Sequence, residues 1–261
     1  MDLGLEGRVA IVCGASQGMG RAIAAGLVAE GALVTLCARN EEQLRAAAQA
    51  IDPQGRQTMT VTADLAQAGS AERLVEETVA ARGRLDIVVN NIGGPPPGQP
   101  SSFSDQDWHA ALEKNFFNVV RLCRAALPHM RKNHWGRIVN LLAISVLQVE
   151  DNLALSSTAR TAVVSFSKSL SDEVAADGIT VNNVLPGSVL TDRLVEVSKM
   201  QAKFHGRDPE TAVEERLVRI PAGRFGKPEE MADLVCFLAS ERAGFINGVS
   251  IPFDGGQLRA M

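Results

Sequence analysis

The chain has 261 residues, of which 46% are apolar and 21% charged, a composition typical of one globular domain. With 26 basic and 30 acidic side chains, the net charge of -4 argues against a nucleic-acid or anionic-membrane surface and favours a small-molecule partner. Neither end of the chain is biased in charge or complexity, so we expect one domain over residues 1–261.

The cysteines, the first residues and the longest apolar run indicate the cellular compartment in which the protein is expected. The four cysteines lie in apolar runs, without paired spacing or a neighbouring histidine, which predicts buried reduced thiols and no metal centre. Residues 1–8 lack the basic start and apolar stretch of a secretory signal. The longest apolar run, residues 138–149, is too short and polar to span a bilayer. We therefore expect a cytoplasmic protein.

Short β-branched runs alternate with longer amphipathic segments, which predicts an α/β fold with a doubly wound parallel sheet and helices on both faces. The seven expected strands are Val9–Cys13, Leu33–Ala38, Thr58–Thr62, Leu85–Asn90, Arg137–Leu142, Thr180–Leu185 and Gly248–Phe253. The expected helices are Met19–Glu30, Glu41–Ile51, Ser70–Arg82, Asp105–His134, Leu155–Asp177 and Pro228–Ser240.

Two segments do not fit this alternation. Residues 93–98 read Gly-Gly-Pro-Pro-Pro-Gly, which predicts a stiff loop beyond the fourth strand because consecutive prolines remove backbone donors. Residues 192–223 are charged and weakly periodic, although the flanking elements need only a short crossover. We expect this segment to be a mobile lid over the substrate, carrying one or two short helices.

Three glycines lie between the first strand and the first helix, at Gly14, Gly18 and Gly20. Glycine lets backbone N–H groups approach a pyrophosphate, whose charge is favoured by the positive end of the helix. This context predicts a dinucleotide site. The alternative is a tight strand-to-helix turn that binds nothing.

Arg39 ends the second predicted strand, about 20 residues beyond the glycines, where the ribose-binding side chain is expected. An acid at this point would accept a hydrogen bond from the adenosine ribose, whereas an arginine pairs with a 2′-phosphate. NADP(H) is therefore favoured over NAD(H). A solvated loop charge is the alternative interpretation of Arg39.

The spacing Gly14-x-x-x-Gly18-x-Gly20 resembles that of the short-chain dehydrogenase/reductase family, which implies a single-domain Rossmann fold. The C-terminal third, including residues 223–230, 245–248 and 254–256, is similar to the 3-oxoacyl-carrier-protein reductase branch, which implies a homotetramer or a dimer. Further matches are Asp64-Leu65, residues 90–93, Asn115, and Pro186-Gly187 with Thr191. The cofactor-binding residues that the resemblance implies are Gly14, Ser16, Gly18, Met19, Gly20, Arg39, Asp64, Leu65, Asn91, Ile92, Gly93, Arg160, Val189 and Thr191.

Several of these residues could instead have a purely structural role. Asp64 could only cap the turn that follows it, and Asn90 or Asn91 could tie neighbouring strands together. Asn115, which the resemblance implies is catalytic, could instead satisfy strand carbonyls from a buried helix face. The family most often has threonine where this chain has Cys13 and alanine where it has Ile92, so hydrogen bonding near the cofactor is expected to differ.

The family's reaction uses a serine, a tyrosine and a lysine. Ungapped alignment through residues 169–174 and 178–182 puts Ala143, Ser156 and Arg160 at these positions, and the chain contains no tyrosine. A phenol titrates near 10 and suits proton transfer, whereas a serine hydroxyl needs a separate base. Arginine stays protonated, so Arg160 can hold a ribose or an oxyanion but cannot relay a proton.

Several side chains are candidates to replace the tyrosine. They are Ser145, Glu150, Asp151 in the loop before the fifth long helix, and His205 in the expected lid, each also explicable as an ordinary solvated or loop side chain. Residues 141–144 read Leu-Leu-Ala-Ile and predict one apolar wall of the substrate pocket.

Three functions remain open from the sequence. The first is an NADP(H)-dependent short-chain oxidoreductase acting on a ketone or alcohol, with Asn115, Ser156 and Arg160 in the catalytic positions. The second is a dinucleotide-binding pseudoenzyme or sensor with little redox turnover. The third is a lyase or isomerase in which Arg160 stabilises an enolate or a carboxylate. We predict that NADPH binds and that turnover of simple 3-oxoacyl substrates is weak or absent.

Overall fold

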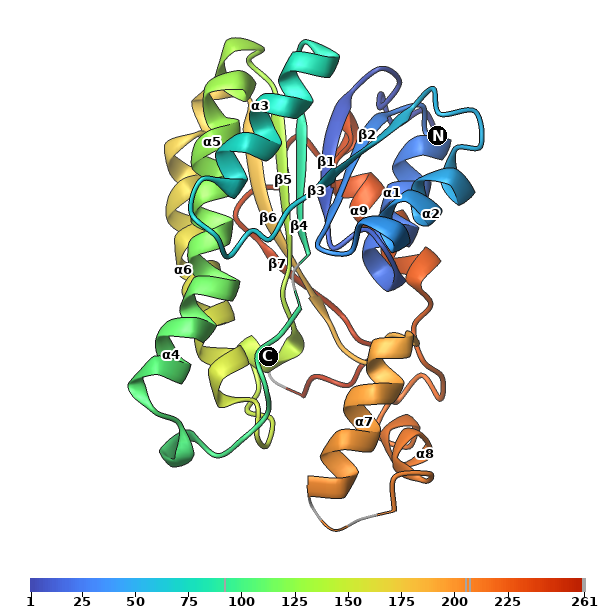
Figure 1. Ribbon diagram of the computed structural model, residues 1–261, viewed down its shortest axis with the longest axis vertical. Helices are drawn as coiled ribbons and strands as arrows, with labels where there is room; N and C mark the ends of the chain where they lie inside the picture. The colour runs from blue at the N-terminus through green and yellow to red at the C-terminus, as the bar shows by residue number, and fades with distance from the viewer. Residues whose placement is uncertain (92, 205, 207, 260–261) are drawn as a thin grey trace.

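The computed structural model describes residues 1–91, 93–204, 206 and 208–259. Seven parallel strands form one sheet in the order β3-β2-β1-β4-β5-β6-β7 (Figure 1). The strands are β1 (Val9–Cys13), β2 (Leu33–Ala38), β3 (Thr58–Thr62), β4 (Ile87–Asn91), β5 (Gly136–Leu141), β6 (Ile179–Pro186) and β7 (Ser250–Phe253). The predicted doubly wound α/β fold is confirmed.

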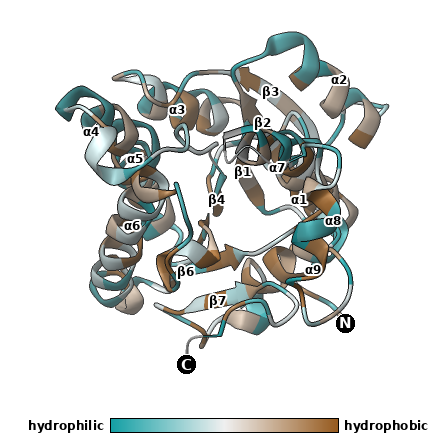
Figure 2. Cartoon of the chain, turned by 90° about the horizontal axis from the view of Figure 1, so that it is seen from below, coloured by the Kyte–Doolittle hydropathy of each residue, from teal (hydrophilic) through white to brown (hydrophobic). Residues whose placement is uncertain are grey.

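Helices cover both faces of the sheet (Figures 1 and 2). One face carries α1 (Gly18–Ala29), α2 (Glu41–Ile51) and α9 (Pro228–Leu238), and the other carries α3 (Ser70–Arg82), α5 (Asn118–Lys132) and α6 (Ala154–Glu173). Three helices lie beyond the carboxyl ends of the strands: α4 (Asp105–Leu112), α7 (Asp192–Phe204) and α8 (Ala212–Leu217).

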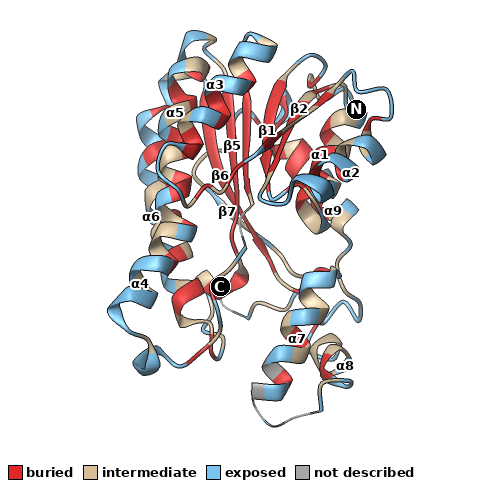
Figure 3. Ribbon diagram, in the orientation of Figure 1, coloured by how far each residue is buried: buried red, intermediate tan, exposed pale blue. Residues whose placement is uncertain are grey.

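The alternation of β1 shows how the sequence builds two cores. Val9, Ile11 and Cys13 face the cluster packed under α3, α5 and α6. Ala10 and Val12 face the cluster packed under α1, α2 and α9. Because successive strand side chains point to opposite faces, a strand covered on both faces must be apolar throughout. The central strands are accordingly buried along their length, whereas α7 has several exposed residues and α8 is mostly half-buried (Figure 3).

Several predicted boundaries were wrong, most of them by one or two residues and the end of α6 by four, since α6 ends at Glu173 rather than Asp177. β4 begins at Ile87 rather than Leu85, because the buried Asp86 carboxylate accepts the backbone N–H of Val9 at 2.9 Å and fastens the chain before the strand. β7 begins at Ser250, since Gly248 turns the chain at φ +69°. The other shifts are at the ends of α1, α6, α9, β5 and β6.

The helix predicted over Asp105–His134 is confirmed as helical backbone over Asp105–Lys132, but it is not one regular α-helix. A π-helical turn over Glu113–Phe117 lies between α4 and α5. In this turn the side-chain amide of Asn115 donates to the Ala111 carbonyl at 3.1 Å, and that of Asn118 donates to the Lys114 carbonyl. Side-chain amides that take up backbone carbonyls compete with the regular helical ladder, which accounts for the interruption.

A chain of polar side chains crosses four strands of the sheet. Asn90 of β4 donates to Asn140 of β5 at 2.7 Å, so the structural alternative for Asn90, a tie between strands, is confirmed. Asn140 donates to Asn183 of β6 at 3.0 Å, and Asn183 donates to Ser250 of β7 at 3.1 Å. These residues are direct neighbours in the strand register, so one layer of amides ties four strands together.

All four cysteines are buried and free, as predicted. Burial raises the pKa of Cys37, Cys123 and Cys236 to about 12, which keeps these thiols protonated. Within the described residues, no helix has the length and apolar character needed to cross a bilayer.

Candidate active site

The turn between β1 and α1 is closely packed against the end of β4. A side-chain carbon added at Gly14, where φ is +61°, would lie 2.4 Å from the Asn91 carbonyl oxygen. The same carbon at Gly20 would lie 2.2 Å from the Gly14 carbonyl oxygen. Asn91 closes the turn by donating its amide to that oxygen at 3.4 Å. Only glycine fits at these two points, and the open turn leaves the N-terminus of α1 accessible to an anion.

A cleft of about 550 Å³ runs from this turn along the carboxyl ends of the strands. Of the residues implied to bind a cofactor, the following line it: Gly14, Ser16, Gly18, Met19, Arg39, Asp64, Leu65, Asn91, Gly93, Arg160 and Thr191. Gly20 and Val189 do not line the cleft. Gly20 is packed against the turn, and Val189 is buried beside Gly226. Ile92 lies outside the described residues.

The Arg39 end of the cleft is polar. Arg39 is exposed, and no hydrogen bond or ion pair joins its guanidinium to any described residue. Asn40 beside it caps α2 by accepting from the Gln43 backbone at 2.9 Å. Asp64 accepts from the Ala66 backbone at 3.1 Å, so it does cap its turn while also lining the cleft. A free arginine at this end can pair with a phosphate.

Ser156 and Arg160 lie one turn apart on α6, at the other end of the cleft. Arg160 donates to the Ser156 hydroxyl oxygen, and Gly94 packs against both side chains. Burial lowers the pKa of Arg160 to about 10, so the guanidinium remains charged at neutral pH. No ion pair with a described carboxylate balances this charge. Arg160 lines the cleft, whereas Ser156 is buried and does not line it, so the cleft presents a fixed cation that holds a buried serine hydroxyl.

Asn115 does not line the cleft. It is buried, and its amide donates to the Ala111 carbonyl of α4 rather than to a strand carbonyl, so its role here is structural but differs from the predicted alternative. Its neighbours Lys114 and Asn118 line the cleft instead. Sequence reasoning missed both residues, because a regular helix does not bring this face of the segment to the strand ends. The sequence signal for this irregular turn was the pair Asn115 and Asn118, because each side-chain amide can donate to the carbonyl one turn earlier in the helix.

The segment after β5 supplies only part of the predicted apolar wall. Leu141 and Leu142 line the cleft and supply the expected apolar wall, whereas Ala143 and Ile144 do not line it. Ser145 is buried, and its hydroxyl has no hydrogen-bond partner among the described residues.

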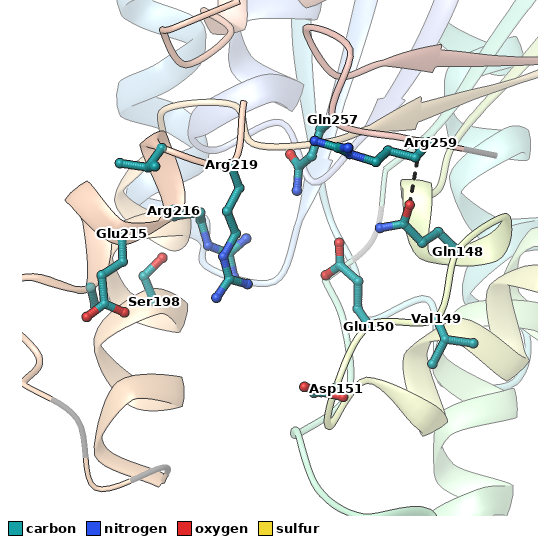
Figure 4. A pocket seen from close by; sticks show the side chains of 12 residues that line it. Gln148, Val149, Glu150, Asp151, Ser198, Glu215, Arg216, Arg219, Gln257 and Arg259 are labelled. Carbon is teal, nitrogen blue, oxygen red and sulfur yellow. Dashed lines mark hydrogen bonds between the residues drawn. The ribbon is translucent and has the colours of Figure 1, made fainter. Parts of the chain in front are cut away.

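Glu150 and Asp151 lie in a second cavity, of about 830 Å³, together with residues of α7, α8 and the C-terminal segment (Figure 4). Neither acid lines the cleft that contains Arg160. His205, the other candidate to replace the tyrosine, lies outside the described residues. The described part of the chain also holds no cluster of three or more histidines, cysteines or acids arranged to bind a metal ion.

A glycine turn at the first crossover of a doubly wound parallel sheet, opening on a cleft at the strand ends, defines a protein of the Rossmann dinucleotide-binding class. A family model described as enoyl-(acyl carrier protein) reductase matches residues 14–257. The 3-oxoacyl-[acyl-carrier-protein] reductase of Escherichia coli is 35% identical over 254 residues, covering 97% of this chain and 98% of that protein. The chain belongs to the short-chain dehydrogenase/reductase family, an oxidoreductase family.

Solved structures are equally similar. L-Sorbose reductase from Gluconobacter frateurii, complexed with NADPH and L-sorbose, has a TM-score of 0.93 and 33% identity, and the match covers 100% of both chains. YwfH, described as an NADPH-dependent reductase involved in bacilysin biosynthesis, has a TM-score of 0.92 and 29% identity, covering 97% of this chain and 99% of that one. Reductases with a wide range of substrates therefore share this fold.

Proposed function

We propose that the protein is an NADP(H)-dependent short-chain oxidoreductase that reduces a ketone or oxidises an alcohol at an atypical site. The observation that carries the proposal is one continuous cleft with the glycine turn in its wall, the free Arg39 at one end and the charged Arg160 at the other. Both cations suit a phosphorylated dinucleotide.

The residues of the cleft fit this cofactor. The turn at Gly14 and the start of α1 would hold the pyrophosphate, and Arg39 would pair with the 2′-phosphate. Two similar reductases are described with NADPH, which supports the same cofactor here. When bound, the nicotinamide supplies or accepts the hydride.

Ser156 and Arg160 would act on the oxygen of the substrate. Because the Ser156 oxygen accepts from Arg160, the hydroxyl hydrogen is free to donate to a carbonyl oxygen. The guanidinium next to it would stabilise negative charge that develops on that oxygen. Arg160 keeps its own proton at neutral pH, since its pKa is about 10. We expect slower proton transfer than a tyrosine would give.

The lack of tyrosine favours a second candidate, a dinucleotide-binding pseudoenzyme or sensor with little turnover. A lyase or isomerase is a third candidate, in which Arg160 would stabilise an enolate or carboxylate. In each case we propose a single domain with residues 192–223 as a lid. A homo-oligomer, a tetramer or a dimer, is the proposed assembly.

The test combines binding and turnover. NADPH and NADH are titrated against the protein by fluorescence, and a panel of ketones is then followed by absorbance. Tighter binding of NADPH with measurable turnover supports the oxidoreductase. Binding without turnover on any ketone supports the pseudoenzyme or sensor, and failure to bind either nucleotide contradicts both proposals.

A further inference from the structure

The second cavity is bounded by two main walls that differ in charge, with Arg259 of the C-terminal segment also lining it (Figure 4). One wall belongs to the segment around α8 and carries Arg216 and Arg219 together with the acid Glu215. The other belongs to the loop that follows β5 and carries Glu150 and Asp151. The arginine side chains extend from the α8 wall into the space, and the two acids face them from across the gap.

Arg219 is an unbalanced cation on the first wall. No hydrogen bond or ion pair joins its guanidinium to a described residue, and the neighbouring Arg216 is also positive. The pKa of Arg216 is lowered by burial and by the charge of Arg219, and it is raised by Glu150 across the cavity. Glu150 thus acts on Arg216, whereas Arg219 retains the capacity to bind an anion.

Asp151 is its counterpart on the second wall. It is exposed, and its carboxylate makes no hydrogen bond or ion pair with the residues that the structure describes. The loop that carries it is held in position, since Asn152 accepts from Gln99 at 2.9 Å and its backbone carbonyl accepts from Gly98 at 2.9 Å. A carboxylate presented by an anchored loop suits an ammonium group or several hydroxyl donors.

Helix α7 contributes side chains both to the cofactor cleft and to the second cavity. Thr191, Asp192, Arg193 and Glu196 line the cofactor cleft, and Ser198 of the same helix lines the second cavity. At the rim, Val149 and Val218 are 93% and 86% exposed and lie on opposite walls. Helix α7 therefore borders both the cleft and the second cavity.

We propose that the substrate is a zwitterionic oxo acid, whose carboxylate is held by Arg219 with Arg216 and whose ammonium group is held by Asp151 with Glu150. The inference rests on the proposed function, because it makes the second cavity the substrate pocket of that oxidoreductase. The opposite charges of the walls would orient the molecule, since the reversed placement puts like charges together.

The experiment uses the full-length protein saturated with NADP⁺ and three matched probes. These are 5-amino-4-oxopentanoate, 4-oxopentanoate, which lacks the ammonium group, and the methyl ester of 5-amino-4-oxopentanoate, which lacks the carboxylate. Binding is measured by calorimetry or ligand-observed NMR, without relying on turnover. We expect the zwitterion to bind at least about tenfold more tightly than either partial probe, because each charge-assisted contact contributes roughly that factor or more.

Two variants at exposed positions, one on each wall, distinguish the contribution of each wall to binding. Arg219→Gln is expected to weaken the zwitterion and 4-oxopentanoate about tenfold and to leave the methyl ester within about twofold. Asp151→Asn is expected to weaken the zwitterion and the methyl ester and to leave 4-oxopentanoate unchanged. Arg56→Gln, in the exposed turn before β3, is the matched control and should change none of the three.

The outcomes are decisive in either direction. Absence of a zwitterion preference, absence of binding by all three probes, or equal effects of both variants on every probe would overturn the inference. A neutral polyol that binds where the zwitterion does not would overturn it as well. Failure of NADP⁺ to bind is detected separately by fluorescence, and it contradicts the proposed function rather than the charge assignment.

Discussion

At the scale of single residues, the cleft combines a turn that tolerates only glycine with an arginine that holds a serine hydroxyl. Gly14 and Gly20 are required because their neighbours lie within 2.4 Å of any added carbon. Ser156 and Arg160, in contrast, form a hydrogen-bonded pair that holds charge without a group suited to proton relay. We therefore predict that cofactor binding and proton transfer can be separated at this site.

Arg39→Asp tests the cofactor assignment. We expect NADPH affinity to fall about tenfold to a hundredfold, because a charge-assisted pair is lost and a like charge is introduced, and NADH affinity to stay level or rise. Both are measured by fluorescence titration. Arg56→Asp, in the exposed turn at the amino end of β3 and away from the carboxyl ends of the strands, is the control. An equal loss of both nucleotides would show that Arg39 does not read the 2′-phosphate.

The combined change Ala143→Ser, Ser156→Tyr and Arg160→Lys tests whether the cleft is otherwise competent. Supplying an acid–base group is expected to raise the rate of ketone reduction by about two to four orders of magnitude. The control carries Ser156→Phe in place of Ser156→Tyr, so it has the ring without the hydroxyl. No gain over this control, in a variant that still binds NADPH, would contradict the assignment of these positions.

At the scale of elements, side-chain amides decide local structure twice. Asn115 and Asn118 interrupt the helix between α4 and α5 and bring Lys114 to the cleft. Asn140 stands at the centre of the polar layer through β4 to β7 and also donates to Ser167 of α6 at 3.0 Å. A buried amide with three partners specifies which strands neighbour one another, since a shifted register would leave several polar groups unsatisfied.

Asn140→Ala is expected to lower the free energy of unfolding by about 3 kcal/mol or more, because the side chains of Asn90, Ser167 and Asn183 each lose a partner in the core. Urea denaturation followed by circular dichroism measures the change. The matched control, Asn40→Ala, removes an exposed helix cap and should cost only about 1 kcal/mol. Equal costs for the two variants would mean that the polar layer contributes little.

At the scale of the whole molecule, the sheet presents two cavities at the carboxyl ends of its strands, and α7 borders both. The segment of residues 192–223 is largely exposed in its described part, whereas the sheet beside it is buried (Figure 3). Segments with few buried contacts open at low free energy, so ligands that touch such a segment have a large effect on its opening.

Limited trypsin digestion should therefore cut first within residues 192–223, where Arg193, Lys199 and Arg219 are accessible. NADPH at saturating concentration should slow this cleavage about tenfold or more, because Thr191, Asp192 and Arg193 line the cofactor cleft. Mass spectrometry identifies the cut. The Arg39→Asp variant at the same NADPH concentration should lose the protection. First cleavage elsewhere, or no protection despite measured binding, would contradict the proposed lid.

The sequence by itself determined the sheet, the glycine turn and the absence of tyrosine. Alternating apolar runs define which faces must be covered, and glycine spacing after a strand carries its own steric reason. These are local properties, so they can be read from neighbours in the chain. Most of the cofactor cleft followed from them, as Gly14, Arg39 and Arg160 show.

Only the tertiary structure decided which side chains meet. In the segment of the π-helical turn, Lys114 and Asn118 line the cleft and Asn115 does not. The loop after β5 places Glu150 and Asp151 in a separate cavity that Arg219 also lines. Such placements depend on how competing hydrogen bonds and loop paths are resolved between segments far apart in sequence. Local sequence patterns do not encode this long-range packing.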